Sequence, residues 1–384
     1  MSDRFALHVS LFYAAFFLYT GLSMPFMPPW LAAKGLDTRE IGIVLAAPLV
    51  ARVVAVPLST RLADRLGMQQ RALVAASLAS VAGFALVGLL SGFGPIFVAY
   101  VLASTALAPV LPLGDAYTLR GLRGRMPRYG RVRLWGSVAF IVANLGGGVL
   151  LARLGAQDVI WAVVGGLVLT AAAAIALPRT APEAVAAVDT RDAPASPWRS
   201  RTFVAVVLGA SLIQGSHAVL YGFATLLWSA RGIGGIAIGA LWALGVVAEI
   251  LLFAASGRVV GAVGPIRMIV LGGVGGAIRW GAMAFDPPIA ALPFLQCLHA
   301  LSYAATHLGA MHFMAQAVPA GRGATAQGDF VAVQGIVFAG AMSLSGVLVA
   351  AYGGAAYGAM AGAAALGALL AAAFGWRSVI PSRN

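Results

Sequence analysis

Five charged side chains lie inside long apolar segments that are suited to crossing a membrane. They are Arg52, Asp115, Arg133, Glu249 and Arg279. A charge near the centre of a membrane helix costs about 2.5–3.5 kcal/mol on insertion scales. These residues must therefore face one another or a water-filled cavity, and each is a candidate for binding a substrate or an ion.

Asp115 and Arg133 form the most informative pair. Each lies nine residues from Gly124, which is near the apex of a predicted turn between two helices. In an antiparallel hairpin both residues return to the same depth, about 13 Å from the apex at about 1.5 Å per residue. This spacing predicts either a shared substrate site or an ion pair that fixes the topology.

A polar stripe continues along the second helix of this hairpin. Ser137, Phe140 and Asn144 follow the arginine at positions i+4, i+7 and i+11, on one helical face. Together they offer a hydroxyl, an aromatic ring and an amide to a ligand. Arg52 adds a second deep cation, which either pairs with Asp115 or leaves a surplus positive charge that favours a carboxylate ligand.

The second half of the chain places Glu249, Arg279 and His299 on three consecutive predicted helices. An intramembrane acid beside an arginine and a histidine is typical of a proton relay. The alternative is a static buried network.

A further polar stripe is formed by Gln214, His217 and Tyr221, at positions i, i+3 and i+7 of one predicted helix. We expect these three side chains to face the substrate cavity. No second acid or thiolate stands at ligand spacing from the histidines, so we expect no metal site. The phosphate-binding pattern GxxxxGK is missing from the sequence, so we expect no nucleotide and no other cofactor.

The composition indicates a membrane protein. Of 384 residues, 61% are hydrophobic and 10% are charged, with a mean hydropathy of +0.92. Soluble domains are about 45–50% apolar and about 25% charged, so an ordinary soluble enzyme and a disordered protein are excluded. Segments of about 20 apolar residues occur twelve times. They are 6–31, 40–60, 71–91, 95–118, 131–153, 158–178, 202–228, 235–256, 266–285, 289–317, 326–350 and 355–376.

The expected fold is all-α and integral to the membrane, with twelve helices in two pseudo-symmetric six-helix bundles. The bundles are predicted at 1–178 and 202–384, the second with a short cytoplasmic tail. Residues 179–201, rich in Pro, Ala and mixed charge, are the predicted cytoplasmic linker.

The basic residues predict the orientation. Nineteen of the 25 fall in loops on one side of the predicted membrane, together with both termini. The positive-inside rule makes that side cytoplasmic, and we expect a multi-pass protein of a bacterial inner membrane. Because topology explains these arginines, we expect no nucleic-acid partner.

Several segments together resemble the lactose-permease-like branch of the major facilitator superfamily, and among its members the phenylpropionate permeases most closely. The segments are 25–31 (PFMPPWL), 63–67 (ADRLG), 112–116 (PLGDA), 129–137 (YGRVRLWGS), 215–218 (GSHA) and 221–223 (YGF). The resemblance covers nearly the whole chain. The segments around Asp115 and Arg133 are its most specific part, whereas ADRLG marks only the superfamily.

The resemblance implies roles for individual residues. Asp115 and Arg133 match the acid and the arginine that contact substrate, and Arg279 and His299 match the arginine and the histidine used in coupling. Ser302 stands where the family carries its proton-binding acid, which leaves Glu249 as the substitute.

Two further positions bear on the substrate and on the conformational cycle. Phe140 stands where the family stacks a tryptophan on a sugar, which disfavours sugar and suits an aromatic acid. Asp64 and Arg65 are expected to help latch the cytoplasmic side.

These observations predict a proton-coupled symporter that imports a small organic acid, such as a phenylpropionate, by alternating access. Its expected partners are the substrate, a proton and the lipid bilayer, and we expect a monomer. The alternatives are a sugar or nucleoside symporter, a drug or metabolite efflux antiporter, and sodium in place of the proton. A membrane-embedded enzyme or a sensor is disfavoured, because a nucleophile–base set and a signalling domain are not evident in the sequence.

Overall fold

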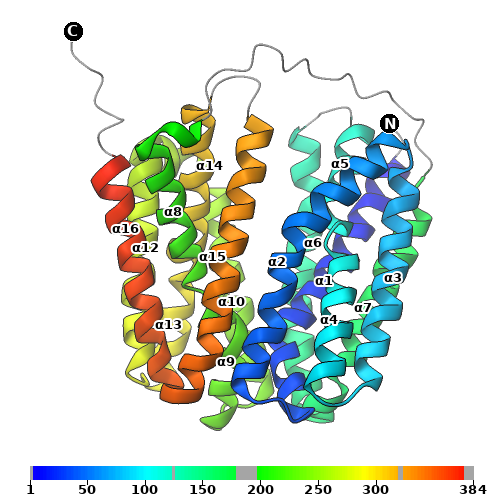
Figure 1. Ribbon diagram of the computed structural model, residues 1–384, viewed down its shortest axis with the longest axis horizontal. Helices are drawn as coiled ribbons and strands as arrows, with labels where there is room; N and C mark the ends of the chain where they lie inside the picture. Colours follow the sequence, from blue (N-terminus) through cyan, green and yellow to red (C-terminus); the bar gives the residue numbers. More distant parts are fainter. Residues whose placement is uncertain (1–2, 123–125, 179–196, 319–322, 376–384) are drawn as a thin grey trace. The chain divides into compact units, whose positions relative to one another are not determined.

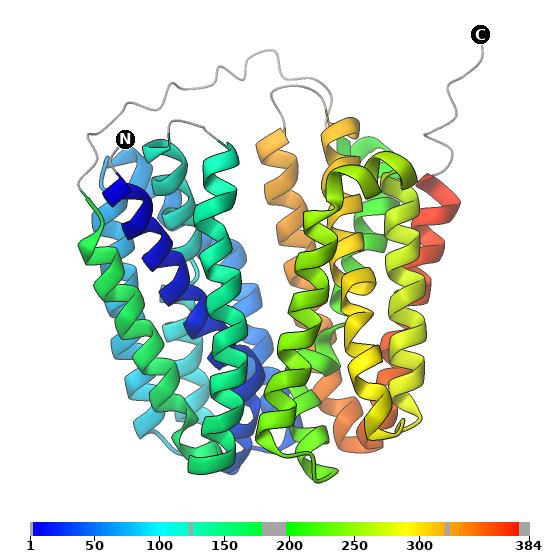
Figure 2. The same cartoon turned by 180° about the vertical axis from the view of Figure 1, so that it is seen from behind.

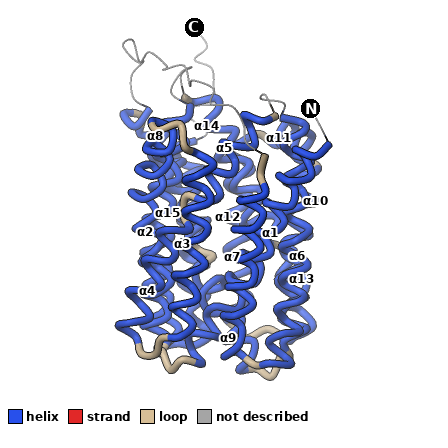
Figure 3. The backbone as a smooth tube through the Cα atoms, turned by 90° about the vertical axis from the view of Figure 1, so that its right-hand side faces the viewer, coloured by secondary structure: helices blue, strands red, loops and turns tan. Residues whose placement is uncertain are grey.

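The computed structural model describes residues 3–122, 126–178, 197–318 and 323–375. Within these ranges the chain is almost entirely helical and contains no strand (Figure 3). The first helices are α1 (Asp3–Ala33), α2 (Thr38–Arg65), α3 (Gln69–Leu89), α4 (Phe93–Leu107), α5 (Val110–Gly121), α6 (Met126–Leu154) and α7 (Val159–Ala176) (Figure 1).

The later helices are α8 (Arg201–Gly215), α9 (Ala218–Ala230), α10 (Gly235–Ala254), α11 (Ser256–Val263), α12 (Pro265–Ala284), α13 (Leu292–Cys297), α14 (Thr306–Ala317), α15 (Gly323–Tyr352) and α16 (Tyr357–Gly375). Short 3-10 turns are η1 (Ala156–Asp158), η2 (Pro197–Arg199), η3 (Ile289–Ala291) and η5 (Gly353–Ala356). A π-helix, η4 (Ala300–Ala305), joins α13 to α14.

The prediction of an all-helical, twelve-span membrane protein is confirmed. Ten stretches of the described chain are long and apolar enough to span a membrane, and α11 and α12 meet the same criterion only as a pair, with a bend of 102° between them. The longest stretch, Ala326–Gly375, has 50 residues and contains two helices, α15 and α16.

Several predicted spans are broken helices. The span predicted at 95–118 consists of α4 and α5, which part at Pro109, because proline has no N–H and its ring clashes with the preceding turn. The span predicted at 202–228 consists of α8 and α9, which part at Ser216 and His217. Breaks at membrane depth free backbone polar groups, so these groups must be satisfied by protein or by a wet cavity.

The chain divides into two compact units, one formed by Met1–Val185 with Phe223–Ala243 and the other by Ala186–Gly222 with Leu244–Asn384. The predicted linker lies mostly outside the described residues, and the predicted domain boundaries stay a prediction.

In the first unit, α1 crosses α6 and α7 at close range (Figure 2). Glycine makes this approach possible, since a Cβ on Gly21 of α1 would lie 2.7 Å from the backbone oxygen of Phe140 on α6. Gly136 of α6 in turn lies against the ring of Phe17 on α1. Small residues at such crossings are typical of membrane helix packing, and here they bring the polar face of α6 to α1.

In the second unit, α8, α12 and α16 pack against one another. Gly209 of α8 and Gly367 of α16 face each other, and a Cβ on either would lie 2.5–2.6 Å from the other's backbone oxygen. The π-helix η4 packs on α12, where Gly275 lies against Leu301.

Candidate functional site

The first unit holds a carboxylate between two tyrosines. Tyr13 Oη of α1 donates to Asp115 Oδ1 of α5 at 2.6 Å, and Tyr129 Oη of α6 donates to the same oxygen at 3.0 Å. Hydrogen bonds to an ionised acceptor are stronger than neutral ones. Asp115 therefore ties three helices together through its side chain.

Arg133 lies beside this cluster but is held by aromatic rings. Its guanidinium carbon lies 4.5 Å from the ring centroid of Phe17 and 5.2 Å from that of Tyr13. The side chain is half-buried. Among the described residues, its N–H donors have no hydrogen-bond or ion-pair partner.

The direct Asp115–Arg133 ion pair that the hairpin spacing allowed does not form between these two described residues. Tyr13 links them instead, because its hydroxyl bonds the acid while its ring lies under the cation. A guanidinium on an aromatic face keeps its planar fork of donors available for a carboxylate.

The remaining predicted residues of the first unit are less closely grouped. On α6, Ser137 is half-buried, while Phe140 and Asn144 are 9% and 0% exposed. Neither side-chain amide atom of Asn144 has a hydrogen-bond partner in the described part of the chain. Arg52 of α2 is exposed and has no partner among the described residues. Arg65 is exposed at the end of α2, and the side chain of Asp64 lies outside the described residues.

A seam of glycines brings the start of α10, residues 235–243 of the first unit, against α6. A Cβ on Gly239 would lie 2.4 Å from the backbone oxygen of Asn144, and one on Gly235 would lie 2.5 Å from that of Gly148. Only glycine allows this approach, because the nearest atoms are backbone.

Replacing Gly239 by alanine should therefore lower the stability of this arrangement by about 1–3 kcal/mol, the usual cost of overpacking. The melting temperature of the purified protein measures the effect. Gly146→Ala on α6 is the matched control, since a Cβ there meets nothing within 4 Å. Equal melting temperatures for the two variants would contradict the close packing of the seam.

In the second unit, a fully buried arginine is held by neutral groups. Arg279 donates through Nη1 to His299 Nδ1 at 3.1 Å and to Ser302 Oγ at 3.2 Å, and through Nη2 to Gln296 Oε1 at 2.6 Å. Its guanidinium carbon lies 4.4 Å from the ring centroid of Trp280. In the part of the chain that the structure describes, no carboxylate pairs with it directly.

These contacts assign the tautomer of His299. Arginine only donates, so Nδ1 of His299 must accept and the ring proton must sit on Nε2. That nitrogen lies 3.3 Å from Glu249 Oε2. The neutral ring therefore connects Arg279 to Glu249, and protonating Nδ1 would break its bond with the arginine.

The tautomer of His217 is assigned in the same way. Its Nδ1 lies 3.2 Å from the backbone oxygen of Ile213 and 3.1 Å from that of Gln214, so Nδ1 carries the proton. Its Nε2 then accepts from the hydroxyl of Ser302 at 3.1 Å. His217 thus satisfies backbone groups at the break between α8 and α9 while it extends the network from Arg279.

The rest of the predicted stripe lies beside this network. Gln214 Nε2 donates to the backbone oxygen of Tyr303 at 3.2 Å. The ring centroid of Tyr221 lies 5.6 Å from that of His217 and 6.4 Å from that of His299. The structure therefore brings the predicted coupling residues and this stripe into one cluster.

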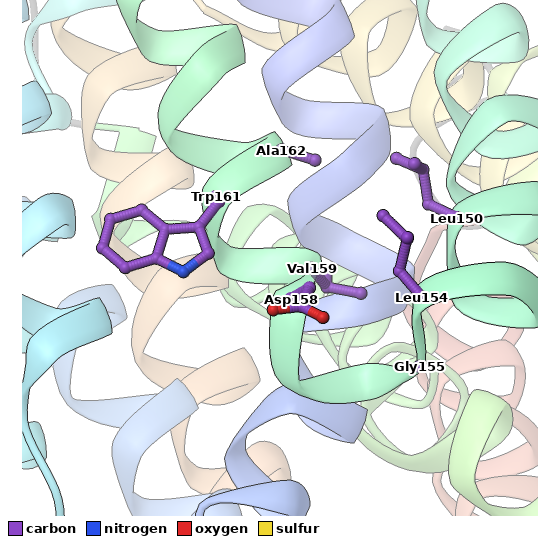
Figure 4. A pocket seen from close by; sticks show the side chains of 7 residues that line it. All are labelled: Leu150, Leu154, Gly155, Asp158, Val159, Trp161 and Ala162. Carbon is purple, nitrogen blue, oxygen red and sulfur yellow. The ribbon is translucent and has the colours of Figure 1, made fainter.

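Other possible sites are weaker. A surface pocket where α6, η1 and α7 meet is lined mainly by apolar side chains such as Leu150 and Trp161, with Asp158 at its edge (Figure 4). None of the predicted site residues lines it. Among the described residues, no group of three His, Cys, Asp or Glu side chains is arranged to hold a metal ion.

Sequence reasoning missed the neutral members of both clusters. The sequence alone does not mark Tyr13, Gln296 or Trp280 as site residues, and it marks Tyr129 only as part of a motif. Gln296 is 2% exposed inside a predicted span, and a buried amide at that depth is the signal that marks it. Tyr13 carries no comparable signal, because tyrosine is common in membrane helices.

The tyrosine that donates to Asp115 provides a direct test of the first cluster. Tyr13→Phe should lower the free energy of unfolding by about 1.5–3 kcal/mol, because it removes a hydrogen bond to a charged group. The ring under Arg133 is kept, so binding should fall less than in Tyr13→Leu. A double-mutant cycle with Asp115→Asn measures the coupling. Tyr352→Phe, at an exposed position, is the control, and a loss no larger than in that variant would contradict the assigned bond.

Comparisons with known proteins agree with this architecture. A model of the MFS_1 like family matches residues 6–366. The chain is 29% identical over 320 residues to the probable 3-phenylpropionic acid transporter of Escherichia coli (strain K12), which covers 80% of this chain and 81% of that protein. It is 31% identical over 291 residues to maltose permease of Geobacillus stearothermophilus, with 73% and 71% covered. The solved structure of nucleoside transporter NupG matches at a TM-score of 0.81 and 16% identity, over 98% of this chain and 100% of that chain.

Proposed function

Because the chain belongs to the MFS_1 like family, and is thus a membrane transporter and not an enzyme, we propose that it imports a small organic carboxylate together with a proton. The expected substrate has an aromatic body, as in 3-phenylpropionate. The proposed cycle alternates access to the two sides of the membrane.

The observation that carries this proposal is the state of Arg133. A half-buried guanidinium that lies on two aromatic rings, with no carboxylate bonded to it among the described residues, is prepared to bind an anion. A carboxylate satisfies the donor fork bidentately. The rings of Tyr13 and Phe17 add an apolar wall, which supports an aromatic acid over a sugar.

We assign the proton to Glu249. In the second unit it is the acid bonded to His299, and that ring is committed on both nitrogens. A carboxylate can bind and release a proton without disrupting the bonds of Arg279. Arg279 and His299 then position the acid, while Gln214, His217 and Tyr221 line the same cluster.

The rest of the proposal concerns the location of the protein and the roles of the remaining predicted site residues. Both termini are placed in the cytoplasm of a bacterium, with the protein in the inner membrane and functioning as a monomer. Asp64 and Arg65 are proposed to latch the cytoplasmic side, and Ser137, Phe140, Asn144 and Arg52 to contribute to the substrate path.

A sugar substrate is the second candidate, since one relative is a maltose permease. A competition assay separates the two. Uptake of labelled 3-phenylpropionate into proteoliposomes is challenged with the unlabelled acid, with its neutral amide and with maltose. We expect the acid alone to compete, because the amide has the same ring and chain without the charge. Equal competition by the amide, or competition by maltose, would overturn the carboxylate assignment.

A further inference from the structure

We propose that His307, on α14, exchanges the transported proton between Glu249 and water. This inference rests on the proposed proton coupling and adds a residue to it. Three histidines belong to this part of the second unit, and they differ in what their ring nitrogens do.

Two of the three histidines already use both of their ring nitrogens in polar contacts. His299 accepts from Arg279 at Nδ1 and faces Glu249 with Nε2, and His217 donates to backbone oxygens and accepts from Ser302. A ring with both nitrogens occupied cannot take up and pass on a proton without breaking a bond.

His307 can take up and pass on a proton without breaking a hydrogen bond. Within the described ranges its ring nitrogens have no hydrogen-bond partner, and the side chain is only partly buried. Its ring centroid lies 6.1 Å from that of Phe253, which follows Glu249 by one helical turn on α10. Residues four apart share a helical face, so Glu249 and His307 lie on the facing sides of α10 and α14. The two are close enough to interact electrostatically.

The π-helix η4 lies among three aromatic rings, those of His299, Tyr303 and His307, which stack on one another. The centroids of His299 and Tyr303 are 5.2 Å apart, and those of Tyr303 and His307 are 6.3 Å apart, with planes within 15° and 6° of parallel. A π-helical turn inside an α-helix often marks a functional position. Here the rings of His299, Tyr303 and His307 stack in one column, which begins beside Glu249 and ends in the first turn of α14.

Other charged groups on the helices that pack against α14 do not compete for His307. Arg279 is bonded within its network, Asp329 accepts from Trp198, and Arg201, Arg258 and Arg267 are exposed. Among the described residues, the titratable groups near His307 are therefore Glu249 from α10 and Tyr303 from η4.

The step is a simple proton transfer. The O–H bond of protonated Glu249 breaks as a bridging water takes the proton, and the same water delivers a proton to a nitrogen of His307. This leaves a carboxylate and an imidazolium. The imidazolium then releases its proton to bulk water, which restores the neutral ring.

Replacing His307 by phenylalanine tests the proposal, because the ring contacts with Phe253 and Tyr303 are kept and only the nitrogens are lost. The protein is reconstituted in liposomes that contain a pH-sensitive dye, and 3-phenylpropionate is the probe. We expect the ratio of proton-driven accumulation rate to exchange rate to fall by about 10²-fold, the lower end of the usual contribution of a positioned proton donor.

The control and the rescue make the result decisive. His312→Phe, at an exposed position of the same helix, should keep the wild-type ratio. Added imidazole should restore the rate of His307→Ala, which a purely structural role would not allow. A wild-type ratio in His307→Phe overturns the inference. Accumulation that persists in Glu249→Gln overturns the assignment of the proton to Glu249, on which this inference rests, so the two failures are distinguishable.

Discussion

Replacing Arg133 by alanine should reduce uptake of 3-phenylpropionate to background. Removing one partner of a buried, hydrogen-bonded charge pair costs about 2–5 kcal/mol, which is a loss of at least about 30-fold in affinity. Arg133→Lys should recover little of it, because an ammonium lacks the planar fork and stacks less well on Tyr13 and Phe17. Initial rates in proteoliposomes, with the amount of inserted protein measured in parallel, give the comparison.

Arg131→Ala is the matched control for this loss. It removes the same charge from the same helix two residues away, where the side chain is exposed. We expect uptake in that variant to stay close to wild type. If Arg133→Ala transports as well as Arg131→Ala, the arginine is not part of the substrate site.

Glu249→Gln should abolish uphill accumulation while substrate exchange continues. One unit of pH difference corresponds to about 1.36 kcal/mol per proton, so a coupled wild type should accumulate substrate about tenfold. The amide keeps the size of the side chain and a contact with His299 but cannot release a proton. The expected ratio of internal to external substrate in the variant is therefore about one.

The ion in the gradient is checked in the same assay. Accumulation by the wild type should be indifferent to replacement of sodium by potassium and should collapse when a protonophore is added. Accumulation that depends on sodium would support sodium as the coupling ion. Tenfold accumulation in Glu249→Gln would show that Glu249 does not carry the transported proton.

The spans were predictable because membrane helices need long apolar runs, a signal that a single sequence carries strongly. The breaks were harder to place. Pro109 marks the division of α4 from α5, but the divisions at His217 and at η4 depend on side chains that satisfy the freed backbone groups. At the end of α8 the backbone oxygens of Ile213 and Gln214 are satisfied by His217, and the distant Ser302 holds the ring of that histidine.

The same limit applies to the clusters. Hairpin spacing predicts that Asp115 and Arg133 share a depth, but it does not predict which way each points around its helix. Tyr13, 102 residues from the acid that it bonds, decides that geometry. In the second unit, the group of Glu249, Arg279 and His299 was predictable from charge at depth alone, since such residues must find one another.

The aromatic seat of Arg133 has a consequence for energetics. The guanidinium stays with the protein, so the net charge moved across the membrane is that of the anion and its proton. For a monocarboxylate and one proton the sum is zero, and a membrane voltage, worth about 2.3 kcal/mol per charge at 100 mV, exerts no force on it. Such a carrier would accumulate its substrate in proportion to the ratio of proton concentrations across the membrane, whether or not the membrane is electrically polarised.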